Sequence, residues 1–129
     1  MNMVSEEEKQ AFLQRVKALR VNPDAIKEVR VKNFIGEPGR EEDYVIPNAD
    51  GKRASLQIYA AITTPAGVIT PDSARRGLIV FGDAYRAEAN QGLGNSHPSI
   101  SNLENIARRE KPVRVEVAKM PGYTSIYTN

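Results

Sequence analysis

The segment that follows Gly51 gathers side chains that could bind an anion. Lys52 and Arg53 supply two positive charges, and Ser55 supplies a hydroxyl close behind them. We expect a helix to begin here, and the free backbone N–H groups at a helix start attract phosphate or carboxylate. We therefore predict Lys52, Arg53 and Ser55 as ligand-binding residues for a small anionic ligand. The alternative is a solvated turn in which Ser55 or Asp50 only caps the helix.

His97 is the only histidine in the chain, and histidine is the side-chain type that transfers protons most readily near neutral pH. It precedes Pro98, which suits the first position of a helix, so the simpler interpretation is a residue at a helix start. If His97 shares a cleft with Lys52 and Arg53, it can act as acid or base while the two cations hold an anionic substrate. We assign no catalytic residue on this basis, and His97 is the alternative candidate.

Other site chemistry finds little support in the sequence. The chain has no cysteine and one histidine, and its carboxylates show no recognisable ligand spacing, so we predict no metal site. Gly92 and Gly94 precede an expected helix, but this pair lacks the preceding strand and the third glycine of a dinucleotide-binding loop. We expect no cofactor. Whether the protein is an enzyme stays open, and a complete catalytic set is missing.

Four helices are expected to position these residues. Apolar residues at helical spacing predict them over roughly residues 6–20, from Gly51 to near Thr64, over residues 71–89, and from His97 onward. The third is the clearest, because Thr70 can cap it and its apolar stripe is continuous. The stripe consists of Ala74, Leu78, Phe81 and Tyr85. The neighbouring Ile79 and Val80 widen this stripe, so we expect deep burial there.

Two strands are expected between the first and the second helix along the sequence, and one after the last helix. Val29, Val31 and Ile35 alternate with polar residues, which is the period of a half-buried strand. The run Tyr44–Ile46 can return antiparallel to it, and residues 113–117 alternate in the same way. We predict an α+β fold with a small antiparallel sheet of about three strands and about four helices, packed mainly on one face of the sheet.

The predicted organisation is a single α+β domain over residues 1–120 with a C-terminal tail over residues 121–129. A sheet of this kind has two edges that must be protected. The tail can cover one edge, the charged residues Arg30, Lys32 and Arg114 can protect it, or two chains can join there. A homodimer is therefore a possible partner arrangement.

Composition narrows the class of protein. Of 129 residues, 40% are hydrophobic and 26% are charged, which is typical of a globular protein, and the net charge of +2 is too even for an evident nucleic-acid partner. The acidic start of the chain lacks the apolar core of a signal peptide, and no segment approaches the roughly 20 apolar residues of a membrane span. We expect a cytoplasmic protein that contacts no membrane.

Several short segments resemble a small, uncharacterised bacterial family of unknown function. They are Ile46-Pro47-Asn48, residues 51–59, Gly67-Val68-Ile69 with Ala74, Gly77 and Leu78, and His97-Pro98-Ser99-Ile100 with Leu103. The resemblance covers most of residues 44–117. It implies a bacterial source and a compact domain, and it brings no activity with it.

Two functions are consistent with these residues. The first is a non-catalytic binding or protein-interaction module with an anion contact at Lys52, Arg53 and Ser55. The alternative is a small hydrolase or transferase that acts on an anionic substrate through His97, with Lys52 and Arg53 as electrostatic clamps. Which ligand, partner or biological process is involved does not follow from the sequence.

Overall fold

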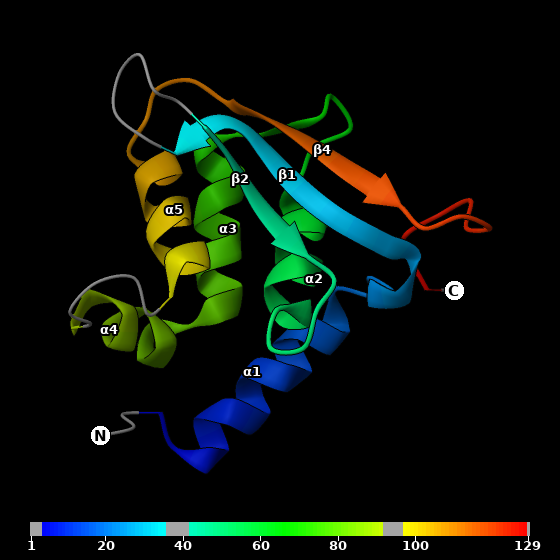
Figure 1. Ribbon diagram of the computed structural model, residues 1–129. Helices are drawn as coiled ribbons and strands as arrows, with labels where there is room; N and C mark the ends of the chain where they lie inside the picture. Colours follow the sequence, from blue (N-terminus) through cyan, green and yellow to red (C-terminus); the bar gives the residue numbers. More distant parts are fainter. Residues whose placement is uncertain (1–3, 36–41, 92–96, 129) are drawn as a thin grey trace.

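The computed structural model describes residues 4–35, 42–91 and 97–128 of the chain. Within these ranges, helices and strands follow one another as shown in Figure 1. The elements are α1 (Glu6–Ala18), a 3-10 helix (Pro23–Ala25), β1 (Ile26–Ile35), β2 (Glu42–Pro47), α2 (Arg53–Ile62), β3 (Val68–Ile69), α3 (Pro71–Phe81), α4 (Asp83–Gln91), α5 (Pro98–Ala107) and β4 (Val113–Lys119). The glycine pair Gly92 and Gly94 lies outside the described residues.

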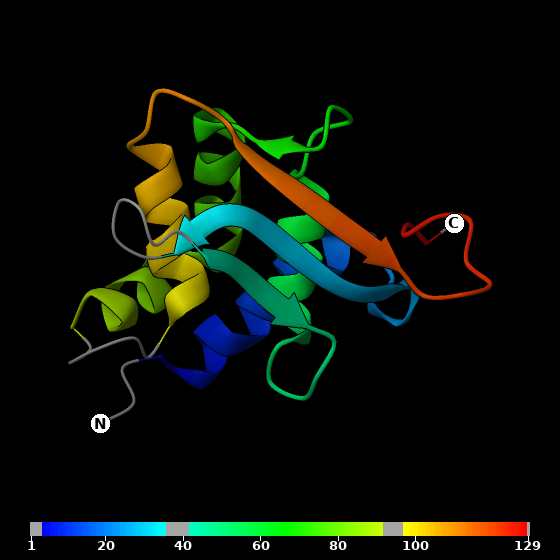
Figure 2. The same ribbon diagram turned by 45° about the horizontal axis from the view of Figure 1, so that its top comes forward.

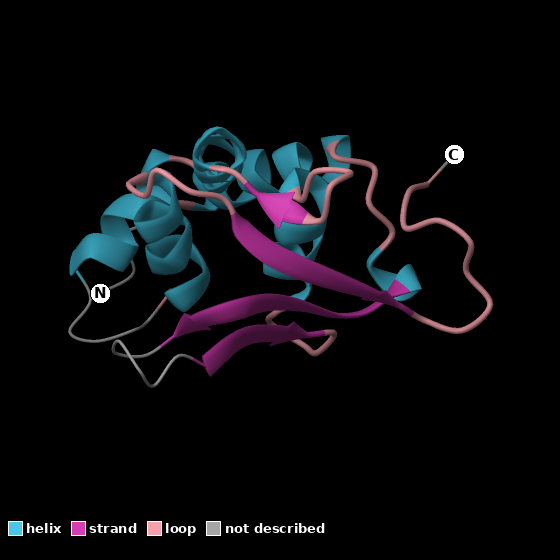
Figure 3. Cartoon of the chain, turned by 90° about the horizontal axis from the view of Figure 1, so that it is seen from above, coloured by secondary structure: helices cyan, strands magenta, loops and turns pink. Residues whose placement is uncertain are grey.

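The strands form one antiparallel sheet in the order β2-β1-β4-β3. The α-helices lie on one side of it, which Figure 3 shows in a view along the sheet. The predicted α+β fold with helices on one face is confirmed. In the described part of the chain the sheet has four strands and the layer above it five α-helices, one more of each than expected.

The extra strand is β3, which has only two residues. It pairs with the start of β4 through Ile69 and Val113, and the Ile69 side chain is fully buried. Two residues are too few to display a period-two pattern, so sequence periodicity does not reveal such a strand.

Residues alternate across the sheet as the pattern predicts. Val29 and Val31 of β1 are buried beneath the helices, while Arg30 and Lys32 are partly exposed. The prediction that these two cations protect a sheet edge is wrong, because β1 lies between β2 and β4. Arg114 is likewise in β4, which lies between β1 and β3. Charge on these residues cannot shield the outer strands.

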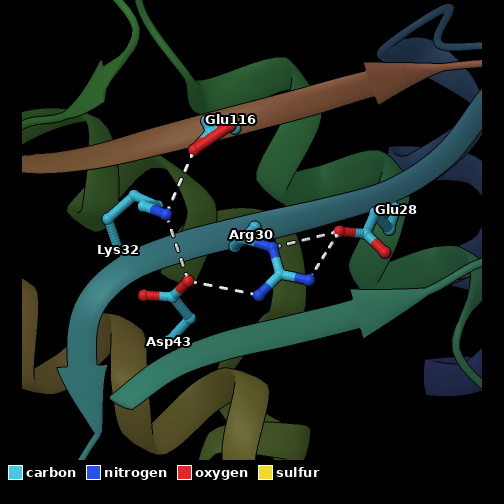
Figure 4. A network of polar contacts seen from close by, with 5 residues as sticks. All are labelled: Glu28, Arg30, Lys32, Asp43 and Glu116. Carbon is cyan, nitrogen blue, oxygen red and sulfur yellow. Dashed lines mark hydrogen bonds and ion pairs between the residues drawn. The ribbon is translucent and has the colours of Figure 1, made fainter. Parts of the chain in front are cut away.

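The cations of β1 instead belong to a network of charges on the open face of the sheet (Figure 4). Asp43 of β2 accepts hydrogen bonds from Arg30 at 3.1 Å and from Lys32 at 3.2 Å. Glu28 pairs with Arg30 at 3.1 Å, and Glu116 of β4 pairs with Lys32 at 3.3 Å. These contacts, with Asp43 contributing most, raise the pKa of both Arg30 and Lys32. The network links three neighbouring strands.

The expected single helix over residues 71–89 is two helices. α3 ends at Phe81 and α4 begins at Asp83, because Gly82 adopts a φ of 87° that only glycine takes readily. The apolar stripe survives this break, since the Tyr85 ring packs 4.8 Å from the Phe12 ring of α1. The expectation that Ile79 is deeply buried is also wrong, because its side chain is 68% exposed on the outer side of α3.

The far end of α3 is held by α1. The Arg15 guanidinium donates to the carbonyl of Val80 at 2.8 Å and to that of Phe81 at 3.1 Å. Carbonyls at a helix C-terminus have no partner inside the helix, so the Arg15 guanidinium supplies the hydrogen bonds that they lack. Its positive charge also interacts favourably with the negative end of the helix dipole. α1 is thereby positioned across the joint between α3 and α4.

The described residues of the C-terminal tail pack on their own chain. Tyr127 forms an isolated antiparallel bridge with Val21, and the Ile126 carbonyl accepts from the Asn22 N–H at 2.7 Å. Thr128 N–H donates to the Arg20 carbonyl at 2.7 Å. Figure 2 shows this red segment curling beside the end of the sheet where β1 begins. These contacts fall on the turn after α1 and not on the edge strand β3.

Candidate functional site

Two helix starts that are far apart in the sequence line one cavity of about 80 Å³. Gly51, Lys52 and Ser55 lie at the start of α2, and residues 97–100 form the start of α5. Phe81, the last residue of α3, adds an apolar wall. In Figure 1, α2 and α5 both begin at the lower end of the helical layer. The structure thus brings together the two segments that the sequence singles out.

The start of α2 has no side-chain cap among the described residues. Lys52 stands at the N-cap with helical backbone angles, φ −115° and ψ −9°, and neither Ser55 nor Asp50 caps the helix. The N–H groups of residues 53–55 accordingly donate to no acceptor in the described part of the chain. Donors of this kind, together with the positive end of the helix dipole, favour an anion.

The three predicted ligand-binding residues differ in their contacts. Lys52 and Ser55 both line the cavity, and neither side chain has a hydrogen-bond or ion-pair partner among the described residues. Arg53 is not among the described residues of the cavity wall, and its guanidinium pairs with the exposed Asp24 carboxylate. One of the two predicted cations is thus free to meet a ligand in this cavity, and the other is already paired.

His97 also lines the cavity, at the N-cap of α5. Its side chain does not cap the helix. Instead Nε2 lies 2.7 Å from Oε1 of Glu88 in α4, and the ring stands edge-on to Tyr85 at a centroid distance of 6.1 Å. The second carboxylate oxygen of Glu88, Oε2, is buried without a hydrogen-bond partner among the described residues. Histidine and carboxylate thus form a partly buried pair beside the cavity.

Ser99 fixes the start of α5 against its neighbours. The Tyr59 hydroxyl of α2 donates to the Ser99 carbonyl at 2.5 Å, and the Tyr44 hydroxyl of β2 lies 2.9 Å from Ser99 Oγ. Burial raises the pKa of both tyrosines, that of Tyr59 well above its ordinary value. These neutral hydroxyls fix the start of α5 to the second half of α2 and to the edge strand β2, so they contribute to the shape of the cavity.

Sequence reasoning did not find Glu88, Tyr44 or Ser99 as residues of this site. Glu88 belongs to a helix that was expected to be continuous with α3, and its partner His97 lies in a different helix. Tyr59 is completely buried, and its hydrogen bond to Ser99 depends on tertiary packing. The spacing of residues along the sequence does not predict contacts between different helices and strands.

The size of the cavity limits what it can hold. A volume of about 80 Å³ equals about two or three water molecules at roughly 30 Å³ each, which is enough for a phosphate or carboxylate group but not for a whole metabolite. In the described ranges, no group of three or more histidine or acidic side chains is close enough to hold a metal ion. Of the helices described, none has both the length and the apolar character that crossing a membrane requires.

The fold and this cavity define the chain as a small α+β protein with its helices on one face of a four-stranded antiparallel sheet. The chain belongs to the bacterial family described as "Uncharacterized protein conserved in bacteria (DUF2322)", whose model matches residues 17–117. The family resemblance of the sequence is therefore confirmed. No curated protein and no solved structure matches the chain. The site must be interpreted from its own geometry.

Proposed function

We propose that this protein is a non-catalytic binding module that holds the phosphate or carboxylate group of a small ligand in the cavity between the starts of α2 and α5. One observation carries the proposal: two helix starts without side-chain caps line a cavity of about 80 Å³ together with Lys52 and Ser55, whose side chains have no partner among the described residues. Each feature alone is common. Their convergence at one small cavity supports an anion site.

The roles of the residues follow from their groups. The Lys52 ammonium supplies the charge, the Ser55 hydroxyl donates a hydrogen bond, and backbone N–H groups of the first turn of α2 complete the contact. Phe81 and Ile100 exclude water from one side, which strengthens the electrostatic attraction. The body of the ligand extends outward, because the cavity accepts only its charged group.

Inorganic phosphate is the simplest probe of this proposal. We expect a titration followed by amide NMR to shift the signals of Lys52, Ser55 and Ser99, while the same ionic strength of sodium chloride leaves them in place. Lys52→Ala should weaken phosphate binding about tenfold or more, which is the loss expected for one charge-assisted hydrogen bond.

Arg53→Ala is the matched control, because it removes the neighbouring cation from the same helix start but not from the described cavity wall. We expect it to change phosphate affinity far less than Lys52→Ala. Equal losses in both variants would show a diffuse surface charge instead of a site. An absence of shifts at the starts of α2 and α5 would also refute the proposal.

A hydrolase or transferase is the second candidate, and one observation favours it. His97 lines the cavity, and its Nε2 lies 2.7 Å from a carboxylate oxygen of Glu88. A carboxylate that orients a histidine is a common arrangement in acid–base catalysis. Turnover of 4-nitrophenyl phosphate or 4-nitrophenyl acetate that disappears in His97→Ala and falls in Glu88→Gln would establish it. Turnover unchanged in both variants would exclude His97.

The finer expectations of location and partners remain predictions. Cell fractionation tests the cytoplasmic location, and light scattering after size-exclusion chromatography tests the homodimer. A dimer that joins at an edge strand should bury β2 or β3, so amide exchange should slow there as concentration rises. Retention on DNA or RNA that depends strongly on salt would contradict the expectation that nucleic acid is not a partner.

A further inference from the structure

A second, larger cavity lies between α3 and α5, with one residue from α4. Its volume is about 380 Å³, which falls within the usual range of small-molecule sites. Leu78 and Ile79 of α3 and Ala107 of α5 provide its apolar surface. None of its described lining residues belongs to the cavity at the starts of α2 and α5. We call it the α3–α5 groove.

Positive charge dominates the polar side of the α3–α5 groove. Three arginines line it, Arg75, Arg86 and Arg108, against a single lining carboxylate, Glu104. Glu104 pairs with Arg86 at 3.8 Å, so that pair is close to neutral. The guanidiniums of Arg75 and Arg108 pair with no carboxylate of the described groove lining, although Arg75 pairs with Asp72 outside it.

The contacts of these two guanidiniums are easily exchanged for a ligand. Arg108 donates at 2.6 Å to Asn105, a neutral acceptor, and has no carboxylate partner among the described residues. Arg75 pairs with Asp72 of the preceding turn, whose side chain is 83% exposed, and reaches the Ala107 carbonyl at 3.3 Å. Exposed ion pairs of this kind contribute little, so an incoming anion can compete with them.

The apolar part of the groove includes a side chain that the fold leaves uncovered. Ile79 is 68% exposed, although it stands one turn of helix from Arg75 and directly after the buried Leu78. Covering a large aliphatic side chain removes apolar surface from water and is favourable by about 25 cal/mol per Å². A ligand that meets both Ile79 and the guanidiniums must carry an apolar body and a negative end.

We propose that the α3–α5 groove binds an amphipathic organic anion, a single apolar chain or ring that ends in a carboxylate or phosphate. The apolar body covers Ile79, Leu78 and Ala107. The anionic end meets Arg75 and Arg108, whose planar guanidiniums suit carboxylate and phosphate oxygens. A bare inorganic ion would leave the apolar surface exposed, and a neutral apolar molecule would desolvate the arginines without compensation.

Octanoate is the probe that tests this proposal, with acetate and 1-octanol as its separated halves. We expect octanoate to shift the NMR signals of Ile79, Ala107 and Arg108 at concentrations where acetate and 1-octanol do not. Comparable shifts with acetate alone would show a plain anion site, and comparable shifts with 1-octanol alone would show a plain apolar site. Either result would overturn the proposal.

The chain offers a matched control for each contact. Arg108→Gln should weaken octanoate binding about tenfold or more, while Arg109→Gln should not, because the Arg109 guanidinium stacks 4.5 Å from the Phe34 ring centroid and is not among the described lining residues. Arg75→Gln and Arg76→Gln form a second pair, since Arg76 lines a different cavity. Equal losses in both members of a pair would refute a specific contact.

Two further variants separate the apolar contact from other causes. Ile79→Ser should weaken octanoate binding about tenfold, whereas Leu13→Ser, which removes another exposed aliphatic side chain from α1, should leave it unchanged. Lys52→Ala should also leave octanoate binding in the groove unchanged. If Lys52→Ala abolishes the shifts of Ile79, octanoate binds at the other cavity and the α3–α5 groove is not a site.

Discussion

The helices of this protein begin in two different ways. α1 and α3 each start with a closed capping box. In α1, the Glu8 N–H donates to Ser5 Oγ at 3.1 Å, and in α3 the Ser73 N–H donates to Thr70 Oγ1 at 3.0 Å. The N-cap side chains of α2 and α5, Lys52 and His97, make no such bond. α2 and α5 both begin at the small cavity.

This contrast separates local from tertiary stabilisation. A capping box satisfies the backbone donors of the N-cap and N3 residues with side chains of the same turn, so it stabilises a helix start and leaves fewer donors for a ligand. The start of α5 is held instead by the bond from the hydroxyl of Tyr59, in the second half of α2, to the Ser99 carbonyl. At the start of α2, the N–H groups of residues 53–55 have no acceptor among the described residues. Stability and availability for binding are thereby assigned to different helix starts.

Gly82→Ala should give the largest loss of stability, because Gly82 is the C-cap of α3 and has a backbone conformation that favours glycine. Gly82 has φ 87° and ψ 162°, a conformation that costs about 1–3 kcal/mol for a residue with a side chain. The added Cβ would also clash with the Arg15 guanidinium that binds the Val80 and Phe81 carbonyls. Chemical denaturation should show a loss of about 3 kcal/mol or more.

Gly67→Ala is the comparison at a glycine of similar φ that Arg15 does not contact. Gly67 also has a positive φ, 78°, but an added Cβ there would meet only the Val115 carbonyl at an ordinary distance of 3.7 Å. We expect a distinctly smaller loss of stability than for Gly82→Ala. If the two variants lose equally, the Arg15 contact does not contribute to closing α3.

Tyr59→Phe should be the next most damaging change, because it removes the hydrogen bond that joins the second half of α2 to the uncapped start of α5. The phenyl ring retains the packing of the buried side chain but leaves the Ser99 carbonyl without its donor, a loss of about 1–3 kcal/mol. Amide exchange should rise in the first turn of α5 more than in α1. Uniform exchange changes would contradict a local role for this bond.

Alkaline pH should weaken the same link. Burial holds the pKa of Tyr59 well above its ordinary value, so the unfolded chain loses the phenol proton first as pH rises. The stability that the neutral hydroxyl contributes is therefore complete below about pH 10 and declines above it. The difference in unfolding free energy between the wild type and Tyr59→Phe should shrink above that pH.

Thr70→Ala tests the closed start of α3. It removes the acceptor for the Ser73 N–H and should lower stability by about 1 kcal/mol, the usual effect of losing an N-cap side chain. Phosphate binding at the other helix starts should not change. Ser5→Ala removes the equivalent cap from α1 and serves as the comparison at a fully exposed start. A change in phosphate affinity in either variant would show that the capped and the uncapped helix starts depend on each other.

The sequence predicts where the helices start better than where they end, and the reason is the range of the interactions. Ser5 with Glu8 announces the start of α1 within four residues, and the alternation around Val29 and Val31 announces β1. The break at Gly82 is missed because the apolar stripe continues through it to Tyr85. Spacing along one helix carries no information about a change of helix direction.

The candidate site could be predicted in part for the same reason. Lys52 and Ser55 follow from the chemistry of a helix start, and the structure places them on one cavity with His97. The pairing of Arg53 with Asp24 and that of His97 with Glu88 join different elements. Such pairs depend on how helices and loops pack, so one sequence cannot reveal which of two adjacent cations stays free.

Lys52→Ala should produce the smallest change in stability and the largest change in binding. The ammonium is exposed and has no ion-pair partner among the described residues, so its removal should alter the free energy of unfolding by less than about 0.5 kcal/mol. Arg53→Ala removes an exposed pair with Asp24 and should cost about as little. Thermal unfolding should therefore show similar stability for the two variants, whereas phosphate titration should show weaker binding for Lys52→Ala. If Lys52→Ala unfolds the protein instead, the open start of α2 is a structural element and the division between stabilising and binding helix starts does not hold.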